Sequence, residues 1–558
     1  MPLDSPTADS PGTAHPARVI LAASLGTGFE WYDFFLYGSL ASVVSKQFFA
    51  GVNPTGGFIF ALLTFAAGFA VRPFGALIFG RLGDLVGRKK TFLATIVTMG
   101  ASTTLVGMLP TYRTVGIAAP IALIALRMLQ GLAIGGEYGG AAIYVAEHAP
   151  PGRRGRYTSW IQTTSTLALL LSLLIISTCR ALLGAAFDSW GWRIPFLVSA
   201  VLLAISVYIR LHLAESPVFA QMLAQGSGSR SPVRDAFGNW ASLRRVLSVL
   251  FGATAGMNVA WYAGQLYALF FLTQVLKVSP QTANLVLGSA LLAGTPLYLL
   301  FGRLSDRVGR KSVVLLGMAL AAASYFPLYR AITHFANPAV EAAASAAPVR
   351  VLAQSGRCSF QFDPLGRRRP LSSCDLAKAA LARAGVPYVT ETNSDRGVAV
   401  IRIGSREAPV AEVPSFEGAG LPVERFEREN AAFYQRLERV LRAAGYPSAA
   451  DPARINRPMV SLCLLMLMVF VTMATGPMAA WLVELFPARV RYTSLSVPYH
   501  IGAGWFGGFM PAVAFTLVAV SGDIYSGLWY PVIVVTATVI VGICSLPETA
   551  GPRAARSP

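Results

Sequence analysis

Two carboxylates share one face of the first long apolar segment of the chain. Glu30, Asp33 and Tyr37 follow one another at spacings of three and four, which places them on the same side of a helix. Two neighbouring carboxylates cannot both ionise cheaply away from water, so we expect one of them to hold a proton near neutral pH. The alternative is that Arg72 and Arg127 neutralise both permanently in a static network.

Other polar side chains inside apolar segments are candidates to bind a small solute. Arg72 and Arg127 carry guanidinium groups, which stay charged and bind carboxylates through two parallel hydrogen bonds. In a later segment, Asn258, Tyr262 and Gln265 repeat at spacings of four and three and form a neutral hydrogen-bonding face. Such a face suits the orientation of a substrate, although it equally suits hydrogen bonds between helices.

One histidine, His500, also lies inside an apolar segment. Its imidazole titrates near neutral pH, so it is a candidate proton relay alongside Glu30 and Asp33. The alternative is a structural histidine that is bonded to a neighbouring helix.

One loop motif occurs twice, at an offset of 222 residues, at 80–90 and 302–312. Each copy contains an aspartate that can accept hydrogen bonds at the start of a neighbouring helix and an arginine that can pair across the loop. Glu137 is expected toward the same end of the molecule, where a role in gating or helix packing is as plausible as contact with a substrate. The predicted gating residues are Gly80, Asp84, Gly87, Arg88, Glu137, Asp306 and Arg310.

The segments that position these residues are long and apolar. The chain of 558 residues is 54% hydrophobic and 13% charged, whereas soluble domains are roughly a quarter charged. A bilayer core of about 30 Å is crossed by about 20 apolar residues. We therefore predict an all-α membrane protein with twelve transmembrane helices, near 19–48, 57–79, 91–110, 117–147, 157–184, 192–212, 246–276, 283–302, 312–334, 458–485, 493–520 and 527–546.

Lysine and arginine are concentrated in every second loop, and therefore on one side of this arrangement. The loops at 80–90, 148–156, 213–245, 303–311 and 486–492 contain 4, 3, 4, 4 and 2 of them, and the short loops between contain at most one each. Because positively charged loops stay in the cytoplasm, we expect both tails, 1–18 and 547–558, on that side. Much of the net charge of +19 is then explained by topology.

A second repeat reveals an insertion. Arg156-Tyr-Thr-Ser159 recurs as Arg491-Tyr-Thr-Ser494 at an offset of 335, which exceeds the first offset of 222 by 113 residues. The extra residues must lie between the ninth and tenth helices, at 336–456. The membrane part then consists of two six-helix halves. These halves are 19–212 and 246–334 with 458–546, joined by a linker at 213–245.

Residues 336–456 are predicted to form a small α+β domain. Strands are expected at 349–353, 385–391 and 397–403, and helices at 373–384 and 423–445. Because the ninth helix runs outward, we expect this domain on the exoplasmic side, where Cys358 and Cys374 could form a disulfide. Its role is open.

Several classes of function are disfavoured by the same residues. The five cysteines form no CxxC pair and the five histidines are scattered, so no metal site is expected. The basic residues do not gather on a polar face, as a nucleic-acid interface requires. Residues 502–507 match G-x-G-x-x-G, but no strand precedes them. We therefore expect no enzyme, no cofactor and no nucleic-acid partner.

The doubled loop and the two six-helix halves resemble the major facilitator superfamily. Within it, residues 26–34, 72–75 and 127–138 resemble the metabolite:proton symporter family, which includes shikimate, alpha-ketoglutarate and proline/betaine transporters. The resemblance implies a bacterial inner-membrane protein that carries small carboxylates or zwitterions together with protons. It also implies that the doubled loops clamp the cytoplasmic ends of the two halves. The large insertion departs from the family pattern.

We therefore expect secondary active symport of a small organic solute with protons, across a lipid bilayer, by rocking of two halves around a central site. Proton-driven efflux is one alternative. The other is a nutrient sensor that has lost transport and binds a ligand or partner through the exoplasmic domain.

Overall fold

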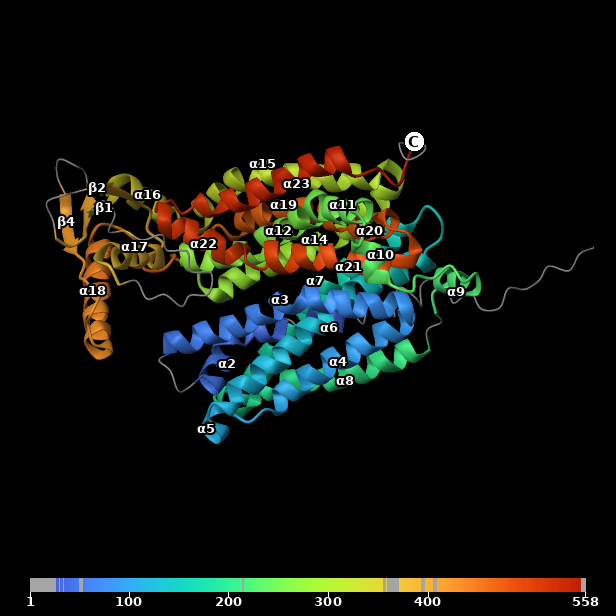
Figure 1. Cartoon of the computed structure of the whole chain (residues 1–558). Helices are drawn as coiled ribbons and strands as arrows, with labels where there is room; N and C mark the ends of the chain where they lie inside the picture. Colours follow the sequence, from blue (N-terminus) through green and yellow to red (C-terminus); the bar gives the residue numbers. More distant parts are fainter. Residues whose placement is uncertain are drawn as a thin grey trace, which may run out of the picture.

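The computed structural model describes residues 27–29, 31–33, 35–49, 54–212, 215–354, 358, 371–392, 397–404 and 409–552. Over these residues the chain forms two helical bundles and a small α/β module at one end (Figure 1). We call this end the module end. The opposite end, which carries α9 (Pro217–Ala224) and α10 (Pro232–Phe237), is the linker end.

The N-terminal half begins with helical residues at 27–29, 31–33 and 35–39. It continues through α2 (Ala41–Phe48), α3 (Pro54–Leu85), α4 (Arg88–Met108), α5 (Tyr112–Val115), α6 (Ala118–His148), α7 (Arg154–Leu183) and α8 (Arg193–Leu211). Gly87, with φ at 120°, separates α3 from α4, because this backbone conformation is open to glycine and strained for other residues. Gly309, with φ at 122°, makes the equivalent break in the C-terminal half.

The C-terminal half consists of α11 (Trp240–Val249), α12 (Ala255–Tyr262), α13 (Ala268–Phe270), α14 (Pro280–Val308), α15 (Arg310–Ala336), α19 (Arg457–Thr475), α20 (Met478–Leu485), α21 (Arg491–Ile501), α22 (Met510–Ser521) and α23 (Trp529–Ser545). π-helical turns interrupt two of its long helices, at Leu250–Thr254, Ala263–Tyr267, Phe271–Val275 and Gly502–Gly507. Such turns are common at functional sites. The two halves meet where α3 packs against α21 and α7 packs against α14.

Ten helical segments among the described residues are long and apolar enough to cross a membrane. They correspond to ten of the twelve predicted spans. The spans expected at 19–48 and 57–79 are not among the ten, although α3 is a continuous helix of 32 residues. The number twelve therefore remains a prediction.

The module between α15 and α19 has its own hydrophobic core, which includes Val351, Leu381, Ile401 and Phe433. Its sheet has the order β2-β1-β3-β4, with β1 parallel to β2 and antiparallel to β3, and β3 antiparallel to β4. Its elements are α16 (Pro338–Ala346), β1 (Val349–Ala353), α17 (Ser373–Ala384), β2 (Tyr388–Thr392), β3 (Val400–Gly404), β4 (Pro409–Pro414) and α18 (Val423–Ala443). A disulfide joins Cys358 to Cys374.

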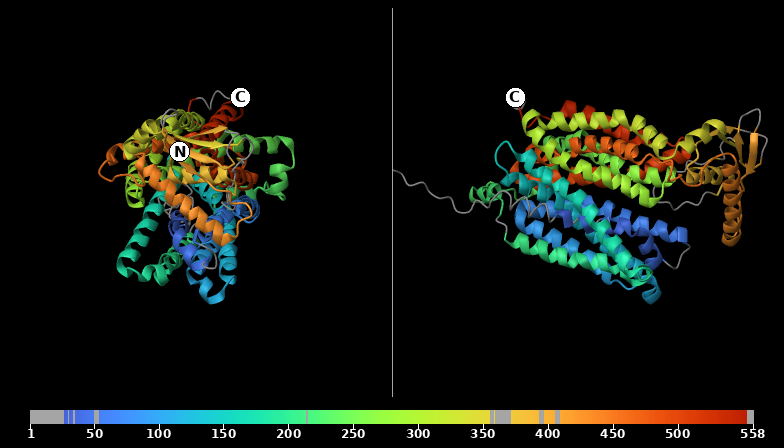
Figure 2. Two further views of the ribbon diagram at one scale, coloured as in Figure 1. Left: turned by 90° about the vertical axis from the view of Figure 1, so that its left-hand side faces the viewer. Right: turned by 180° about the vertical axis from the view of Figure 1, so that it is seen from behind.

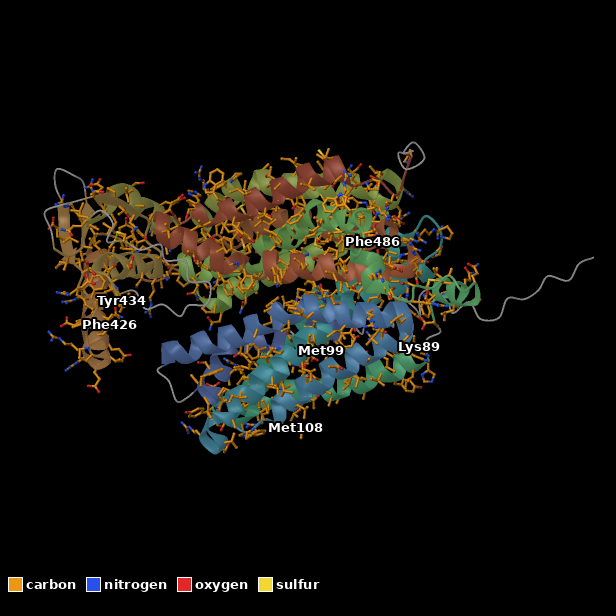
Figure 3. All side chains as sticks on the ribbon, in the orientation of Figure 1. Lys89, Met99, Met108, Phe426, Tyr434 and Phe486 are labelled. Atoms are coloured by element: carbon orange, nitrogen blue, oxygen red, sulfur yellow. A yellow bond between two sulfur atoms is a disulfide. The ribbon has the colours of Figure 1, made fainter. Side chains whose placement is uncertain are left out.

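The module differs in detail from the prediction. The second and third strands begin three residues later than expected, and β4 and α16 were not expected. Gly385 adopts φ 72° and ends α17, so the chain cannot become extended until after it. Seen from the module end, α18 crosses in front of the bundles (Figure 2, left). Phe426 and Tyr434 mark α18 among the side chains (Figure 3).

Candidate functional site

A narrow pocket lies between the two halves, and both contribute to its walls. The space open to the centre of a water molecule is about 30 Å³. The N-terminal half contributes Thr27, Trp31, Arg72, Ile134, Tyr138 and Gln162, and the C-terminal half contributes Met257, Asn258, Trp261, Tyr262, Thr475, Tyr499, His500 and Ala503. A solute bound here would therefore touch both halves at once.

Aromatic rings join the two halves across the pocket. Trp31 of the first helix and Trp261 of α12 have ring centres 5.8 Å apart. Tyr138 of α6 stacks almost parallel on Tyr499 of α21, with the ring centres 3.6 Å apart. An aromatic face that is not covered by another ring is negative and attracts organic cations. None of these four was predicted as a binding residue, because a sequence does not show which aromatic residues of different helices meet.

Four of the predicted residues line this pocket: Arg72, Asn258, Tyr262 and His500. Arg72 is 4% exposed, and its guanidinium carbon lies 4.3 Å from the ring centre of Phe69. The side-chain amide of Asn258 donates to the Thr254 carbonyl at 2.8 Å. The pocket thus combines a permanent positive charge with neutral polar groups and aromatic rings.

His500 is 1% exposed, and neither of its ring nitrogens has a hydrogen-bond partner among the described residues. The structural alternative considered for it, a bond to a neighbouring helix, is therefore not present in the part of the chain that the structure describes. A buried imidazole without a partner is costly. A water molecule or a polar solute in the pocket could supply the missing hydrogen bond.

Arg127 lies deeper in the N-terminal half and does not line the pocket. Its Nη1 donates to Gln130 Oε1 at 2.5 Å, and Gln130 Nε2 donates to Thr103 Oγ1 at 2.8 Å. The guanidinium carbon of Arg127 lies 3.5 Å from the ring centre of Tyr37. Arg127 is therefore part of a polar network that joins the first helix, α4 and α6.

Asp33 belongs to the same interior and is 5% exposed. It accepts a hydrogen bond from Ser199 of α8. Thr103, which is bonded to Gln130, is also a hydrogen-bond neighbour of Asp33. The other predicted carboxylate, Glu30, lies outside the described residues, so its relation to Asp33 stays a prediction.

Two further predicted residues lie apart from the pocket. Gln265 is beside Tyr298 of α14. Glu137 accepts from Arg210 at 2.6 Å and from Thr95 at 2.7 Å, all within the N-terminal half. This ion pair joins α6 to α8 and favours the helix-packing interpretation of Glu137.

At the linker end, the first copy of the doubled loop binds the C-terminal half. Asp84 accepts from the backbone N–H groups of Tyr492 at 3.2 Å and Thr493 at 2.9 Å, at the start of α21. The positive end of a helix dipole stabilises such a carboxylate. Gly80 packs directly against Thr493, and Arg88 donates to the Ala488 carbonyl at 2.8 Å.

The second copy makes the reciprocal contact with the N-terminal half. Asp306 accepts from the N–H groups of Gly155 at 2.8 Å and Arg156 at 2.9 Å, at the start of α7. Arg310 pairs with Asp306 at 3.0 Å and with Glu484 at 2.6 Å. Each half thus caps a helix of the other. We call these two sets of contacts the clamp.

Two more ion pairs extend the clamp and correct the second repeat. Arg491 pairs with Glu147 at 2.7 Å, and Arg154 pairs with Glu484 at 3.5 Å. The equivalent of Arg491 is therefore Arg154 and not Arg156, at an offset of 337. The shared Arg-Tyr-Thr-Ser letters are shifted by two residues relative to the helix starts.

Two glutamates at the linker end were not predicted as functional residues from the sequence. Glu215 accepts from the N–H of Lys89 at 3.2 Å, and Glu548 accepts from the N–H of Arg310 at 2.6 Å. They cap α4 and α15, the helices that begin directly after the doubled loops. Lys89 and Phe486 mark this region in Figure 3. The sequence could have indicated these two glutamates, because each one comes shortly after the last helix of a six-helix half.

Comparison with known proteins agrees with this architecture. A family model described as "Sugar (and other) transporter" matches residues 19–235, and one described as "MFS/sugar transport protein" matches residues 143–353. The proline/betaine transporter of Escherichia coli (strain K12) is 38% identical over 309 residues, which are 54% of this chain and 61% of that protein. The shikimate transporter of the same strain is 36% identical over 323 residues, which are 56% of this chain and 72% of that protein.

The first of these relatives is thus matched over about six tenths of its own length. A solved structure of the proton:xylose symporter XylE, bound to 6-bromo-6-deoxy-D-glucose, superposes with a TM-score of 0.56 at 15% identity. The superposition covers 96% of this chain and 97% of that one, and it shows a shared fold. The chain has the doubled loop, the reciprocal clamp and relatives that are transporters and not enzymes. It therefore belongs to the major facilitator superfamily of membrane transporters.

Proposed function

We propose that this protein imports a small zwitterionic or carboxylate metabolite together with protons, by alternating access across a bacterial cytoplasmic membrane. The observation that carries the proposal is the central pocket, where an arginine, a histidine without a partner and several aromatic rings converge from both halves. Because both halves touch a bound solute, rocking them would expose it to each side in turn.

The pocket chemistry suits a zwitterion whose cationic part is weakly hydrated. Trp31 and Trp261 line the pocket, and aromatic rings attract organic cations. Arg72 offers a guanidinium to its carboxylate. Proline and betaine, which the E. coli relative is named for, have this combination of groups.

The proposed orientation places the linker end in the cytoplasm and the module end outside, as the lysine and arginine distribution predicts. In this orientation the clamp closes the cytoplasmic side, and its opening would release the solute inward. Asp33 and His500, with Glu30, are the proposed proton-binding groups. Of the predicted solute contacts, Arg72, Asn258 and Tyr262 are retained as direct ones, while Arg127 and Gln265 would act by positioning neighbouring groups.

Uptake of radiolabelled glycine betaine, proline and shikimate by cells that express the protein tests this function. We expect accumulation of at least one of them above the external concentration, and loss of that accumulation with a protonophore. Faster loss of preloaded solute in expressing cells, without accumulation, would favour efflux instead. Binding without movement in either direction would favour the sensor.

A further inference from the structure

A second cavity lies where the module meets the helix ends of the C-terminal half. Its volume is about 500 Å³, within the range of about 300–1,000 Å³ that is typical of sites for small organic ligands. The module contributes α17 and β2 to its walls. The membrane part contributes the segment around Lys277 and the end of α22.

Hydrogen bonds hold the two walls of this cavity together. The Tyr388 N–H donates to the Gly522 carbonyl at 2.9 Å, and the Tyr388 hydroxyl donates to the Ala519 carbonyl. Lys277 Nζ donates to the Arg383 carbonyl at 2.6 Å. Gly522 has φ at 81°, and a Cβ there would lie 2.0 Å from the Tyr388 oxygen. The cavity is therefore built by specific contacts, because its walls cannot shift without breaking them.

The charged groups in the cavity are both positive. Lys277 and Arg383 line it, and no carboxylate is among the described residues that form its walls. Burial and the nearby Arg383 guanidinium lower the pKa of the Lys277 amine. Lys277 also has φ at 56°, a conformation that is strained for a residue with a side chain. An anion between the two cations would relieve their repulsion.

Apart from Gln274 and Tyr388, the remaining wall is apolar and includes Val386, Phe515, Val518 and Ile524. A ligand that fits both walls has an anionic group at one end and an apolar body at the other. We propose that this seam between the module and the membrane helices is a second binding site, which takes an amphiphilic organic anion. The anion is either a free organic acid or the headgroup region of an anionic phospholipid, since both present the same chemistry.

Protection of a single cysteine tests the site in the full-length protein. The native Cys179, Cys463 and Cys544 are replaced by alanine and the disulfide is kept. Ala382→Cys then reports from the cavity wall, and Ala432→Cys on the exposed face of α18 is the matched control. The rate of maleimide labelling is measured in phosphatidylcholine nanodiscs, which leave both faces of the protein accessible.

The probes are 3-phenylpropionate and its neutral amide, 3-phenylpropanamide. We expect the acid to slow labelling at Ala382→Cys and the amide to leave it unchanged, with no effect at Ala432→Cys. A second arm replaces part of the phosphatidylcholine with phosphatidylglycerol, and protection there without added acid identifies the lipid as the source. Equal protection by the acid and the amide would overturn the proposal. The absence of protection by both the acid and phosphatidylglycerol would overturn it as well.

Arg383→Gln supplies the charge test, because the Arg383 carbonyl and not its side chain bonds Lys277. We expect the concentration of the protecting anion needed for half-maximal effect to rise about tenfold, as for the loss of one charge-assisted contact. Arg383→Lys keeps the charge and is expected to retain most of the protection. Unchanged protection in Arg383→Gln would contradict an anion site. None of these outcomes depends on transport through the central pocket.

Discussion

At the residue scale, the central pocket combines a guanidinium group with aromatic rings. Arg72 lies beside Phe69, while Trp31 and Trp261 meet from opposite halves. The two ends of a zwitterion would then be held by different elements, so its binding would depend on the distance between the halves. Side-chain substitutions test these assignments separately.

The first prediction concerns Trp261. Trp261→Ala is expected to raise the KM for glycine betaine about tenfold, because a desolvated cation–π contact contributes about 1–2 kcal/mol. Trp261→Phe keeps a ring and is expected to change KM less. Trp529→Ala, at a residue that is 54% exposed, is the control. Initial uptake rates over a range of concentrations give these values, and equal KM values for all variants would remove the aromatic assignment.

The second prediction concerns Asp33. Asp33→Asn cannot exchange a proton, so we expect it to lose accumulation against a gradient while exchange of labelled for unlabelled solute continues. Asp188→Asn makes the same change at an exposed ion pair with Lys46 and is expected to behave as wild type. Accumulation and exchange are compared in proteoliposomes with an imposed pH gradient. Wild-type accumulation by Asp33→Asn would place the coupling proton elsewhere.

The third prediction concerns the buried pair of Glu137 and Arg210, whose side chains are 2% and 1% exposed. Glu137→Gln leaves the Arg210 charge uncompensated, and breaking a buried pair costs about 3–5 kcal/mol. We expect a clear fall in the thermal unfolding temperature in detergent, with KM unchanged in the protein that remains folded. A stable variant with a selectively altered rate would restore the gating interpretation.

At the element scale, the clamp depends on helix starts. Asp84 and Asp306 each cap a helix of the opposite half, so the closed linker end is held by two reciprocal carboxylates. Neither contact involves the pocket. Their loss should therefore change the rate of conformational exchange and not the affinity for solute.

The fourth prediction applies this reasoning to Asp84→Asn, Asp306→Asn and the double variant. Each asparagine weakens a charge-assisted contact by about 1–2 kcal/mol. We expect slower net transport in the single variants, a larger loss in the double variant, and KM values within about twofold of wild type. Asp235→Asn in the linker is the control. Parallel loss of affinity and turnover would show that the clamp also shapes the pocket.

At the scale of the whole molecule, the module is a separately cored insertion. Its two connections to the membrane part lie together, because the Asn456 N–H donates to the Phe335 carbonyl at 2.9 Å. A short linker can therefore close the gap without strain. The module packs on the C-terminal half through α16 against α15 and through α17 and β2 against α22.

The fifth prediction is that the carrier folds without the module. Replacing residues 338–455 with a short Gly/Ser linker should give a monodisperse protein that still accumulates solute, with some loss of stability where the seam becomes exposed. Size-exclusion chromatography and uptake measure the two properties. As a control, the same Gly/Ser segment is inserted after Asn337 with the module retained. This control separates the effect of the linker from the effect of losing the module. Aggregation of the shortened protein alone would make the module part of the core fold.

The sequence determined much of this protein by itself. Hydrophobic length predicted the helical segments, and the two repeat offsets predicted the two halves and the position of the insertion, because these patterns can be read directly from the order of residues. The doubled aspartates were found as a pair for the same reason. The start of β2 was missed by three residues, since the turn at Gly385 outweighs local β propensity.

Only the tertiary structure decided which side chains meet. Arg72 and Arg127 are both arginines inside apolar segments, yet Arg72 lines the pocket while Arg127 turns to Gln130 and Tyr37. The stacked Tyr138 and Tyr499 are 361 residues apart, and the seam cavity joins Lys277 to Arg383. Helical spacing fixes the face on which a residue lies. The neighbour of that face depends on how helices from the two halves and the module pack together, and no local pattern encodes this.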